Sequence, residues 1–466
     1  MATMRQEAVY PPLAAGRDRL ADAYLFWLFG VLAGYVLLGK GFAYLGMPPL
    51  YVGDLTLLVG MLLFLRLNCF AGILATLPMV LFAVLAIWVV ARTVPYIGRD
   101  GTEALRDTVV VTYGGFAVIV IALLLEDASR INAILRNYRR LIAVIVPAST
   151  FLCLLQRFMG EHLPNLPGSD IPVLGLQPGD PAVNLAGAIV FMLAGLRQSR
   201  LLWNFAVFVS LAVVASLSRG PLLAAIVPIV FAALLLGKWR QLVRLAAIGL
   251  ALFGIAYVIE PAFQQYHDPV SSQTRPISTR QVVENVEGIL GRGDAQGQGT
   301  KRWRIDFWDS IVADTIHGPY FWTGRGFGVN LAEAYGFPGH NDPKLRDPHN
   351  VVMTMLARAG VPGAALWLLF VASWFAMMLR AMMLAQRRGQ PEWAGLFVFA
   401  MSYVLSLIIN ACFDPSLEGP MQGVWFWCLI GFGTGSAMIY RQSSQPPALA
   451  MPAAPPARLR VEGPVR

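Results

Sequence analysis

The sequence predicts an all-α polytopic membrane protein with about twelve transmembrane helices and a large helical loop outside the membrane between spans 9 and 10. The first reason is composition: 56% of the 466 residues are hydrophobic and 14% are charged, whereas soluble domains carry about 25% charged residues. The second is a mean hydropathy of +0.58. The third is that apolar residues gather into runs close to the roughly 20 residues that cross a bilayer.

Twelve apolar runs are candidate spans, and a long polar stretch separates the ninth from the tenth. The candidate spans lie at 23–46, 49–67, 70–91, 108–125, 141–159, 182–197, 201–217, 219–237, 242–260, 361–384, 393–412 and 421–440. Very short connections, such as the single residue between the seventh and eighth spans, predict tight hairpins.

Lysine and arginine residues predict the orientation. With a cytoplasmic N-terminus, most arginines face the cytoplasm, including those in 136–140 and 387–388. The short outer loops then hold few basic residues: Lys40, Arg92, Arg99, Arg106, Arg157 and Arg219. By the positive-inside rule, both termini are cytoplasmic and the segment 261–360 lies outside.

This topology predicts four regions. Residues 1–260 form an N-terminal transmembrane region with spans 1–9, 261–360 an outer loop, 361–440 a C-terminal transmembrane region, and 441–466 a disordered cytoplasmic tail rich in Pro and Ala.

Within the outer loop, residues 277–290 and 301–316 show helical patterning. The glycines between them predict a flexible loop: Gly291, Gly293, Gly297 and Gly299.

Several classes of protein are disfavoured. The net charge of +9 is spread over short loops between spans, which argues against nucleic-acid binding. The first 20 residues lack the apolar core of a cleavable signal peptide. The four cysteines lie in or beside apolar runs without metal-binding spacing, so we expect free thiols. No nucleotide-binding, kinase, serine-hydrolase or zinc motif is present, and we expect neither a metal nor a cofactor.

The first candidate site residue is Arg219, in the sequence Ser218-Arg219-Gly220-Pro221 at the outer end of a hairpin. An arginine near the membrane core is costly and therefore suggests function. Its planar guanidinium suits phosphate oxygens. The alternative is an arginine that extends to the membrane interface for solvation.

A cationic and aromatic helix start follows at residues 301–308. Arg304 and Trp308 share one helical face, where the indole could hold the guanidinium by stacking. We expect Trp303, Phe307 and Ile311 to dock this helix on the membrane surface. The alternative is an ordinary interfacial amphipathic helix.

The stretch Thr323-Gly324-Arg325-Gly326-Phe327-Gly328 resembles a phosphate-binding loop. It lacks the preceding strand and following helix that such loops need, so a tight turn packed on the membrane domain is favoured. Arg325 remains a candidate for phosphate contact.

His349 opens a short amphipathic helix that Gly360 and Gly363 close before the tenth span. An imidazole titrates near neutral pH and can act as a general base. Asp347 is close enough in sequence to orient it. The alternative is a histidine that only caps the helix.

In order and spacing, these motifs resemble the O-antigen ligase family of the wider O-antigen ligase/polymerase superfamily. The resemblance is carried by Ser218-Arg219-Gly220, Arg304-x-x-x-Trp308, residues 324–328, and His349-Asn350 leading to residues 360–363. It covers roughly residues 180–440, and the first five spans match in topology only.

The resemblance implies a bacterial inner-membrane glycosyltransferase whose outer loop is periplasmic. Its donor would be an O-antigen polysaccharide linked to undecaprenyl diphosphate, and its acceptor a sugar hydroxyl of lipid A–core oligosaccharide. His349 would be the catalytic base in a metal-independent, inverting transfer. Arg219, Arg304 and Arg325 would bind the diphosphate.

The residues that the resemblance implies as supporting ones are Trp308, Asp347 and Asn350. An O-antigen polymerase or a protein O-oligosaccharyltransferase would need the same donor site. The short tail after Tyr440 and the His349-Asn350 pair favour the ligase. A transporter of lipid-linked glycans would place ionisable residues at mid-membrane in two related halves, whereas few are found there.

Overall fold

The computed structural model describes residues 18–48, 50–67, 69–198, 201–264, 278–289, 295–338, 345–443 and 449. In this part of the chain, eight helices are long and apolar enough to cross a membrane. They are α1 (Arg19–Leu38), α5 (Leu77–Asp100), α7 (Val109–Thr112) together with α8 (Gly114–Glu126), α9 (Arg130–Met159), α13 (Trp239–Gln264), α17 (Val351–Arg387), α18 (Pro391–Ala411) and α19 (Pro420–Gln442).

Three shorter apolar helices complete this set: α10 (Gly179–Leu193), α11 (Leu201–Leu217) and α12 (Arg219–Leu235). The predicted span 49–67 corresponds to α3 (Val52–Leu67), which has 16 residues. The protein is therefore an all-α, multi-pass membrane protein. The predicted hairpin between the seventh and eighth spans is confirmed, because Ser218 alone separates α11 from α12.

The remaining elements are short or belong to the outer loop. They are α2 (Lys40–Ala43), the antiparallel pair β1 (Gly46–Met47) and β2 (Leu50–Tyr51), α4 (Phe70–Ile73), α6 (Thr102–Asp107), η1 (Gly160–His162), α14 (Thr279–Ile289), α15 (Ala295–Thr315), α16 (Leu331–Ala334) and η2 (Ser416–Glu418).

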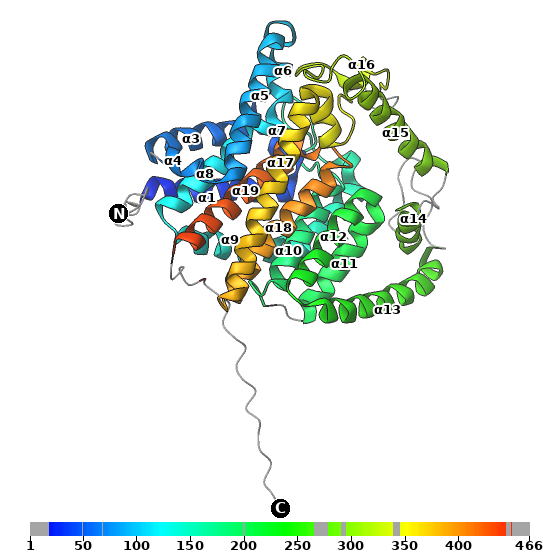
Figure 1. The fold of residues 1–466 in the computed structure, drawn as a ribbon. Helices are drawn as coiled ribbons and strands as arrows, with labels where there is room; N and C mark the ends of the chain where they lie inside the picture. The colour runs from blue at the N-terminus through cyan, green and yellow to red at the C-terminus, as the bar shows by residue number, and fades with distance from the viewer. Residues whose placement is uncertain are drawn as a thin grey trace, which may run out of the picture.

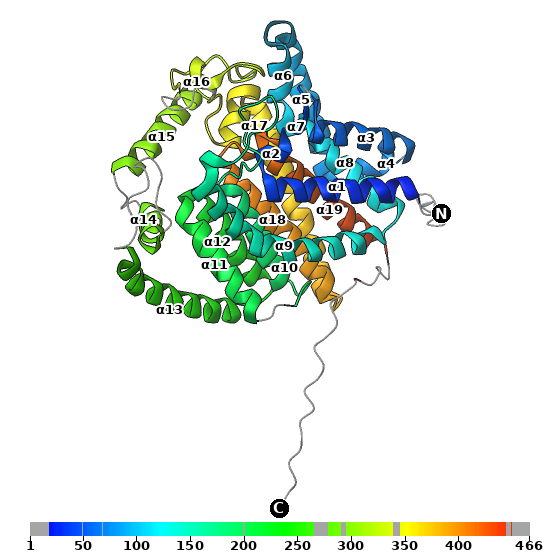
Figure 2. The same cartoon turned by 180° about the vertical axis from the view of Figure 1, so that it is seen from behind.

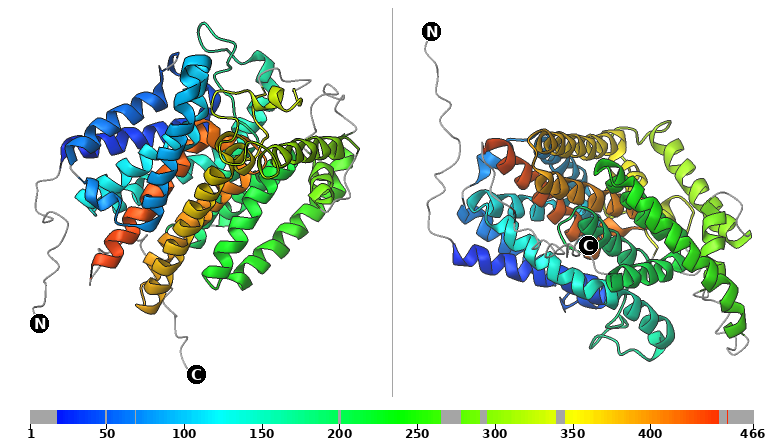
Figure 3. Two further views of the ribbon diagram at one scale, coloured as in Figure 1. Left: turned by 45° about the horizontal axis from the view of Figure 1, so that its top comes forward. Right: turned by 90° about the horizontal axis from the view of Figure 1, so that it is seen from below.

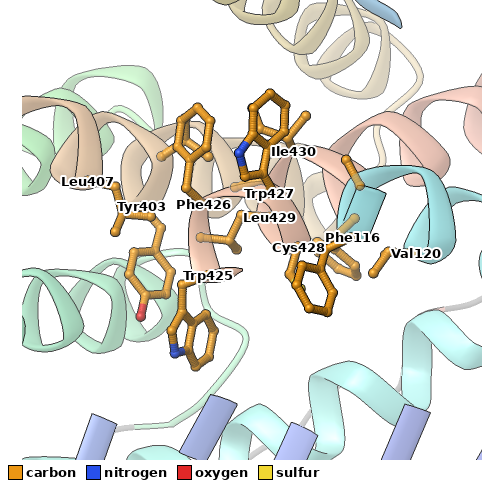
Figure 4. Packing of buried hydrophobic residues seen from close by; sticks show 14 of the residues in the cluster. Phe116, Val120, Tyr403, Leu407, Trp425, Phe426, Trp427, Cys428, Leu429 and Ile430 are labelled. Atoms are coloured by element: carbon orange, nitrogen blue, oxygen red, sulfur yellow. The ribbon is translucent and has the colours of Figure 1, made fainter. Parts of the chain in front are cut away.

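The core of the bundle is formed around α18 and α19, the most buried of the long helices. Aromatic residues of α19 dominate it, among them Trp425, Phe426 and Trp427 (Figure 4). The ring of Trp427 stacks on that of Phe370 at 5.4 Å between centroids, and the ring of Phe426 on that of Trp367 at 5.8 Å. The buried indole of Trp427 donates a hydrogen bond to the carbonyl of Val110 at 3.0 Å. A buried indole N–H needs such a partner, so these contacts hold α19 against α7 and α17.

Three helices pass around the outside of α11 and α12. Figures 1, 2 and 3 show α13, α14 and α15 following one another along this flank. The helices predicted at 277–290 and 301–316 are confirmed as α14 and α15. The predicted loop is wrong for Gly297 and Gly299, which lie inside α15; residues 290–294 lie outside the described residues.

Candidate functional site

The start of α17 holds His349 in an unusual backbone conformation. His349 has φ 54° and is the one non-glycine residue with positive φ in the described ranges. The helix cap is the next residue: the Oδ1 atom of Asn350 accepts hydrogen bonds from the amides of Val352 and Met353, at 2.9 and 3.3 Å. The alternative that His349 only caps the helix is therefore wrong, because Asn350 performs that role.

Two carboxylates face the Nδ1 edge of the His349 imidazole. Nδ1 lies 3.9 Å from Oδ1 of Asp347 and 4.0 Å from Oδ1 of Asp414. Asp347 also accepts the backbone N–H of His349 at 3.0 Å, which fixes the turn that carries the ring. With Nδ1 facing carboxylates, Nε2 is the nitrogen on the opposite edge. This arrangement orients an imidazole to take a proton at Nε2.

Asp414 is the residue that sequence reasoning missed. It lies in the loop between α18 and α19, far from His349 in the chain. Burial raises the pKa of Asp414 to about 6; Asp180 and Asp347 also raise it, while His349 and Arg304 lower it. One signal was available: Asp414 and Glu418 are the only acidic residues between 393 and 442.

Arg304 stands next to this carboxylate pair. Its guanidinium interacts electrostatically with both Asp414 and Asp347, while burial lowers the pKa of the group. An arginine stays charged despite such a shift, because the guanidinium is a very strong base. Its Nε atom is buried and has no hydrogen-bond partner among the described residues. The structure thus brings one predicted diphosphate-binding residue to the catalytic candidate.

Arg219 lies at the start of α12, next to a residue that packs on the loop carrying Asp414. It is the first residue of α12, and the following Gly220 packs on Phe413, the neighbour of Asp414, with room for no bulky side chain. The guanidinium of Arg219 lies against Gly288 of α14, where a Cβ would not fit. Asn285 holds α14 there by donating to the carbonyls of Ala215 and Ser216, at 2.9 and 3.2 Å.

The glycine-rich loop 323–328 uses backbone amides to bind α17 and not an anion. The backbone N–H groups of Arg325 and Gly326 donate to the carbonyls of Ala357 and Arg358, at 2.7 and 3.0 Å. Those carbonyls are available because the helix breaks at Gly360, which has φ 71°. The phosphate-binding alternative is therefore excluded for these two amides, and the tight turn is confirmed.

Arg325 has structural partners of its own. Its Nε lies 2.7 Å from Oδ2 of Asp314, and its guanidinium sits 4.9 and 4.6 Å from the ring centroids of Tyr320 and Tyr335. None of these neighbours is a predicted site residue. The geometry supports a role in holding the loop and gives no support to diphosphate contact by Arg325.

Trp308 supports the site by a different contact from the predicted one. Its indole N–H donates to the carbonyl of Pro348 at 2.9 Å, directly before His349. The cation–π contacts found within the described ranges do not pair it with Arg304.

The apolar face of α15 packs on protein, so the expectation that it docks on the membrane surface is wrong for two of its residues. Phe307 and Ile311 are fully buried in the protein core. Phe307 stacks on Phe337 at 4.9 Å between centroids. Trp303 lies at the edge of this cluster, with its ring 6.2 Å from that of His349.

Fold and site together define a multi-pass membrane protein in which a histidine, two carboxylates and Arg304 are gathered where several helices end, with Arg219 next to a residue that packs on the Asp414 loop. Residues 204–368 match the family model described as O-antigen ligase, and this part of the chain is an O-antigen ligase family domain. The family points to a membrane enzyme of the glycosyltransferase type that acts on lipid-linked glycans. No curated protein matches the chain. The matched segment contains Arg219, Arg304 and His349, whereas Asp414 lies beyond it.

Proposed function

We propose that this protein is an O-antigen ligase, which transfers polysaccharide from undecaprenyl diphosphate to a sugar hydroxyl of lipid A–core. The observation that carries the proposal is the position of His349, oriented by two carboxylates with Arg304 beside them. Membership of residues 204–368 in the O-antigen ligase family supports the same donor chemistry.

The chemistry follows from the residues. The acceptor hydroxyl gives its proton to Nε2 of His349 while its oxygen attacks the anomeric carbon of the donor. The bond from that carbon to the diphosphate oxygen breaks, and the diphosphate leaves with the electron pair. Arg304 and Arg219 stabilise the developing negative charge, a contribution that is often the largest in such sites. A single displacement inverts the configuration.

Asp414 and Asp347 act on the base rather than on the sugar. An ionised carboxylate beside Nδ1 favours the tautomer with hydrogen on Nδ1 and leaves Nε2 able to accept a proton. It also stabilises the imidazolium that forms. This assigns Asp414 a positioning role that complements the predicted role of Asp347.

The membrane arrangement belongs to the same proposal. The protein would cross the bacterial inner membrane about twelve times, with both termini in the cytoplasm and the site on the periplasmic side. Residues 261–360 would be the periplasmic loop between the transmembrane regions 1–260 and 361–440. Figure 1 shows α15, α16 and the start of α17 at one end of the bundle, which supports a common side for the site elements.

Purified protein in detergent, mixed with an undecaprenyl-diphosphate-linked glycan, lipid A–core and EDTA, tests the function. We expect glycan on lipid A–core with the wild type and none with His349→Ala. Longer lipid-linked chains, or glycan on an added protein acceptor, would replace the ligase assignment with polymerase or protein transferase. Absence of transfer to every acceptor would reject the transferase and favour a transporter.

A further inference from the structure

Asp180 is a buried carboxylate that the proposed mechanism does not use. It is the second residue of α10 and its relative exposure is 3%. Oδ1 accepts a hydrogen bond from Nε2 of Gln422 at 2.8 Å, and Oδ2 accepts one from the backbone N–H of Gln177 at 2.9 Å. The start of a helix favours negative charge, and Lys40 interacts electrostatically with the group. Full burial disfavours the charged form of this carboxyl group, whereas these contacts favour it.

A hydrogen-bonded path leads from Asp180 to Asp414. Oε1 of Gln422 accepts from Nδ2 of Asn410 at 3.2 Å. The carbonyl of Asn410 in turn accepts the backbone N–H of Asp414 at 3.0 Å. Gly179 packs so closely on the Asn410 side chain that no Cβ would fit between them. The start of α10, the end of α18 and the start of α19 are therefore tied together directly behind the loop that carries Asp414.

Asp180 also acts on Asp414 through its charge. The charged groups that interact with Asp414 are His349, Arg304, Asp347 and Asp180. The first two favour its ionised form and the last two oppose it. A negative charge held nearby raises the pKa of a carboxyl group because the two like charges repel each other. Asp180 differs from the other three in lying on α10, whereas Arg304 lies on α15 and Asp347 and His349 directly precede α17.

We propose that Asp180 is a positioning residue for Asp414: it anchors the Asp414 loop through Gln422 and Asn410, and its carboxylate charge acts on Asp414 through space. The catalytic meaning of this inference rests on the proposed function.

Infrared pH titration of the purified full-length protein tests the electrostatic part. The C=O band of protonated Asp414 is identified as the band that disappears in Asp414→Asn. In Asp180→Asn we expect the midpoint of this band to move to lower pH by about one unit, the size of a neighbouring-charge effect. An unchanged midpoint in a folded Asp180→Asn protein would overturn the proposal.

Two further variants keep the test decisive. Asp180→Glu retains the charge and is expected to keep the wild-type midpoint. Asp180→Ser is neutral and smaller, and it replaces Asp180→Asn if that protein does not elute as a folded monodisperse species. A midpoint that follows side-chain size rather than charge across these variants would count against the inference.

Asn410→Leu tests the tether while Asp180 keeps its charge. We expect the glycan-transfer kcat to fall several-fold, since the Asp414 loop loses its link to Gln422. A wild-type kcat would reject the tether. The titration needs no substrate, so failure of glycan transfer by the wild type would reject the proposed function and leave the test of Asp180 intact.

Discussion

The conformation of His349 explains how its ring meets two carboxylates. Positive φ is rare for residues with side chains, although histidine is among those enriched there. Such a residue costs on the order of 1–3 kcal/mol and persists only where its surroundings hold it. Here the backbone N–H of His349 is held by Asp347, and the helix that follows is capped by Asn350. The local turn therefore sets the direction of the imidazole before any substrate binds.

Replacement His349→Asn should separate catalysis from folding. Asparagine tolerates positive φ, so we expect a thermal unfolding midpoint within a few degrees of wild type. It lacks a basic nitrogen, and transfer should fall by about 10²–10⁴-fold. Unfolding followed by intrinsic fluorescence, together with the transfer rate, checks both parts. Near-normal turnover would show that His349 is not the base.

Replacement Asp414→Asn should lower activity without lowering stability. The pKa of Asp414 is raised from its ordinary 3.8 to about 6. Ionisation of Asp414 therefore costs free energy in the folded state. The contribution of its protonated form to the free energy of unfolding is complete below pH 3.8 and is lost as the pH rises through about 6. Asparagine stays neutral, so at pH 7–8 the variant should be at least as stable as wild type.

The same variant should transfer glycan roughly 10- to 100-fold more slowly, since the base loses part of its contribution. In the wild type, the transfer rate should fall as pH is lowered through about 6, when Asp414 becomes neutral. Rate and unfolding midpoint, each measured against pH, check these expectations. A variant less stable than wild type at pH 8 would contradict the assigned cause.

Replacement Arg304→Lys keeps the charge but loses the planar fork that binds two phosphate oxygens. We expect kcat to fall about 10-fold, the loss of one charge-assisted hydrogen bond. Arg302→Lys is the matched control. Arg302 also lies on α15, but its side chain is exposed, with a relative exposure of 86%. Equal activities for the two variants would make Arg304 a structural residue.

At the scale of elements, the break in α17 at Gly360 joins the outer loop to the membrane domain. The N–H of Val361 donates to the carbonyl of Phe321 at 2.8 Å, and a Cβ on Gly360 would lie 2.6 Å from that oxygen. Glycine is required here both by its φ of 71° and by this close approach. The short helix that begins after His349 therefore ends at a fixed point.

Replacement Gly360→Ala should destabilise the protein by more than about 1–2 kcal/mol, the cost of a left-handed conformation for a residue with Cβ, with the contact to Phe321 added. Gly254→Ala in α13 is the control, because nothing lies within 4 Å of a Cβ at that position. Thermal unfolding of both variants provides the measurement. A Gly360→Ala protein as stable as the Gly254→Ala protein would show that the break is not required.

Sequence periodicity predicted the elements well but not the contacts between distant elements. The helices at 277–290 and 301–316, the hairpin at Ser218 and the glycine break before the tenth span depend on local residues, and the structure contains all of them. The ion pair of Arg325 with Asp314 spans only 11 residues but follows no helical or strand period, whereas His349 and Arg304, the partners of Asp414, come from distant elements. Chain spacing alone gives no distance between Asp414 and His349, 65 residues apart, which is why the second carboxylate was missed.

At the scale of the whole molecule, the two ends of the bundle carry different charged residues. One end holds the starts of α10, α12 and α17 with Asp180, Arg219 and His349. At the other, Lys238 donates to the carbonyl of Leu193 at 2.6 Å and Arg139 to that of Leu196 at 3.0 Å. Basic residues that cap helix ends on one side agree with the positive-inside rule.

Cysteine labelling should therefore distinguish the two ends. In a background without the native cysteines, Asp306→Cys should react with a membrane-impermeant maleimide in right-side-out vesicles. Arg387→Cys should react only after the vesicles are opened. Both positions are exposed in the structure. Labelling of Arg387→Cys in sealed vesicles would reverse the proposed orientation.

Because hydrogen bonds join the glycine-rich loop to α17, the two should be exchanged together when chimeric proteins are made. Arg325 and Gly326 donate to carbonyls of Ala357 and Arg358, and Val361 donates to Phe321. A chimera that takes the outer loop from a relative but joins it before residue 351 would combine donors from one parent with acceptors from the other. Crossover points placed before 320 and after 363 keep both halves from the same parent, so hybrid proteins should be built with this segment as a single cassette.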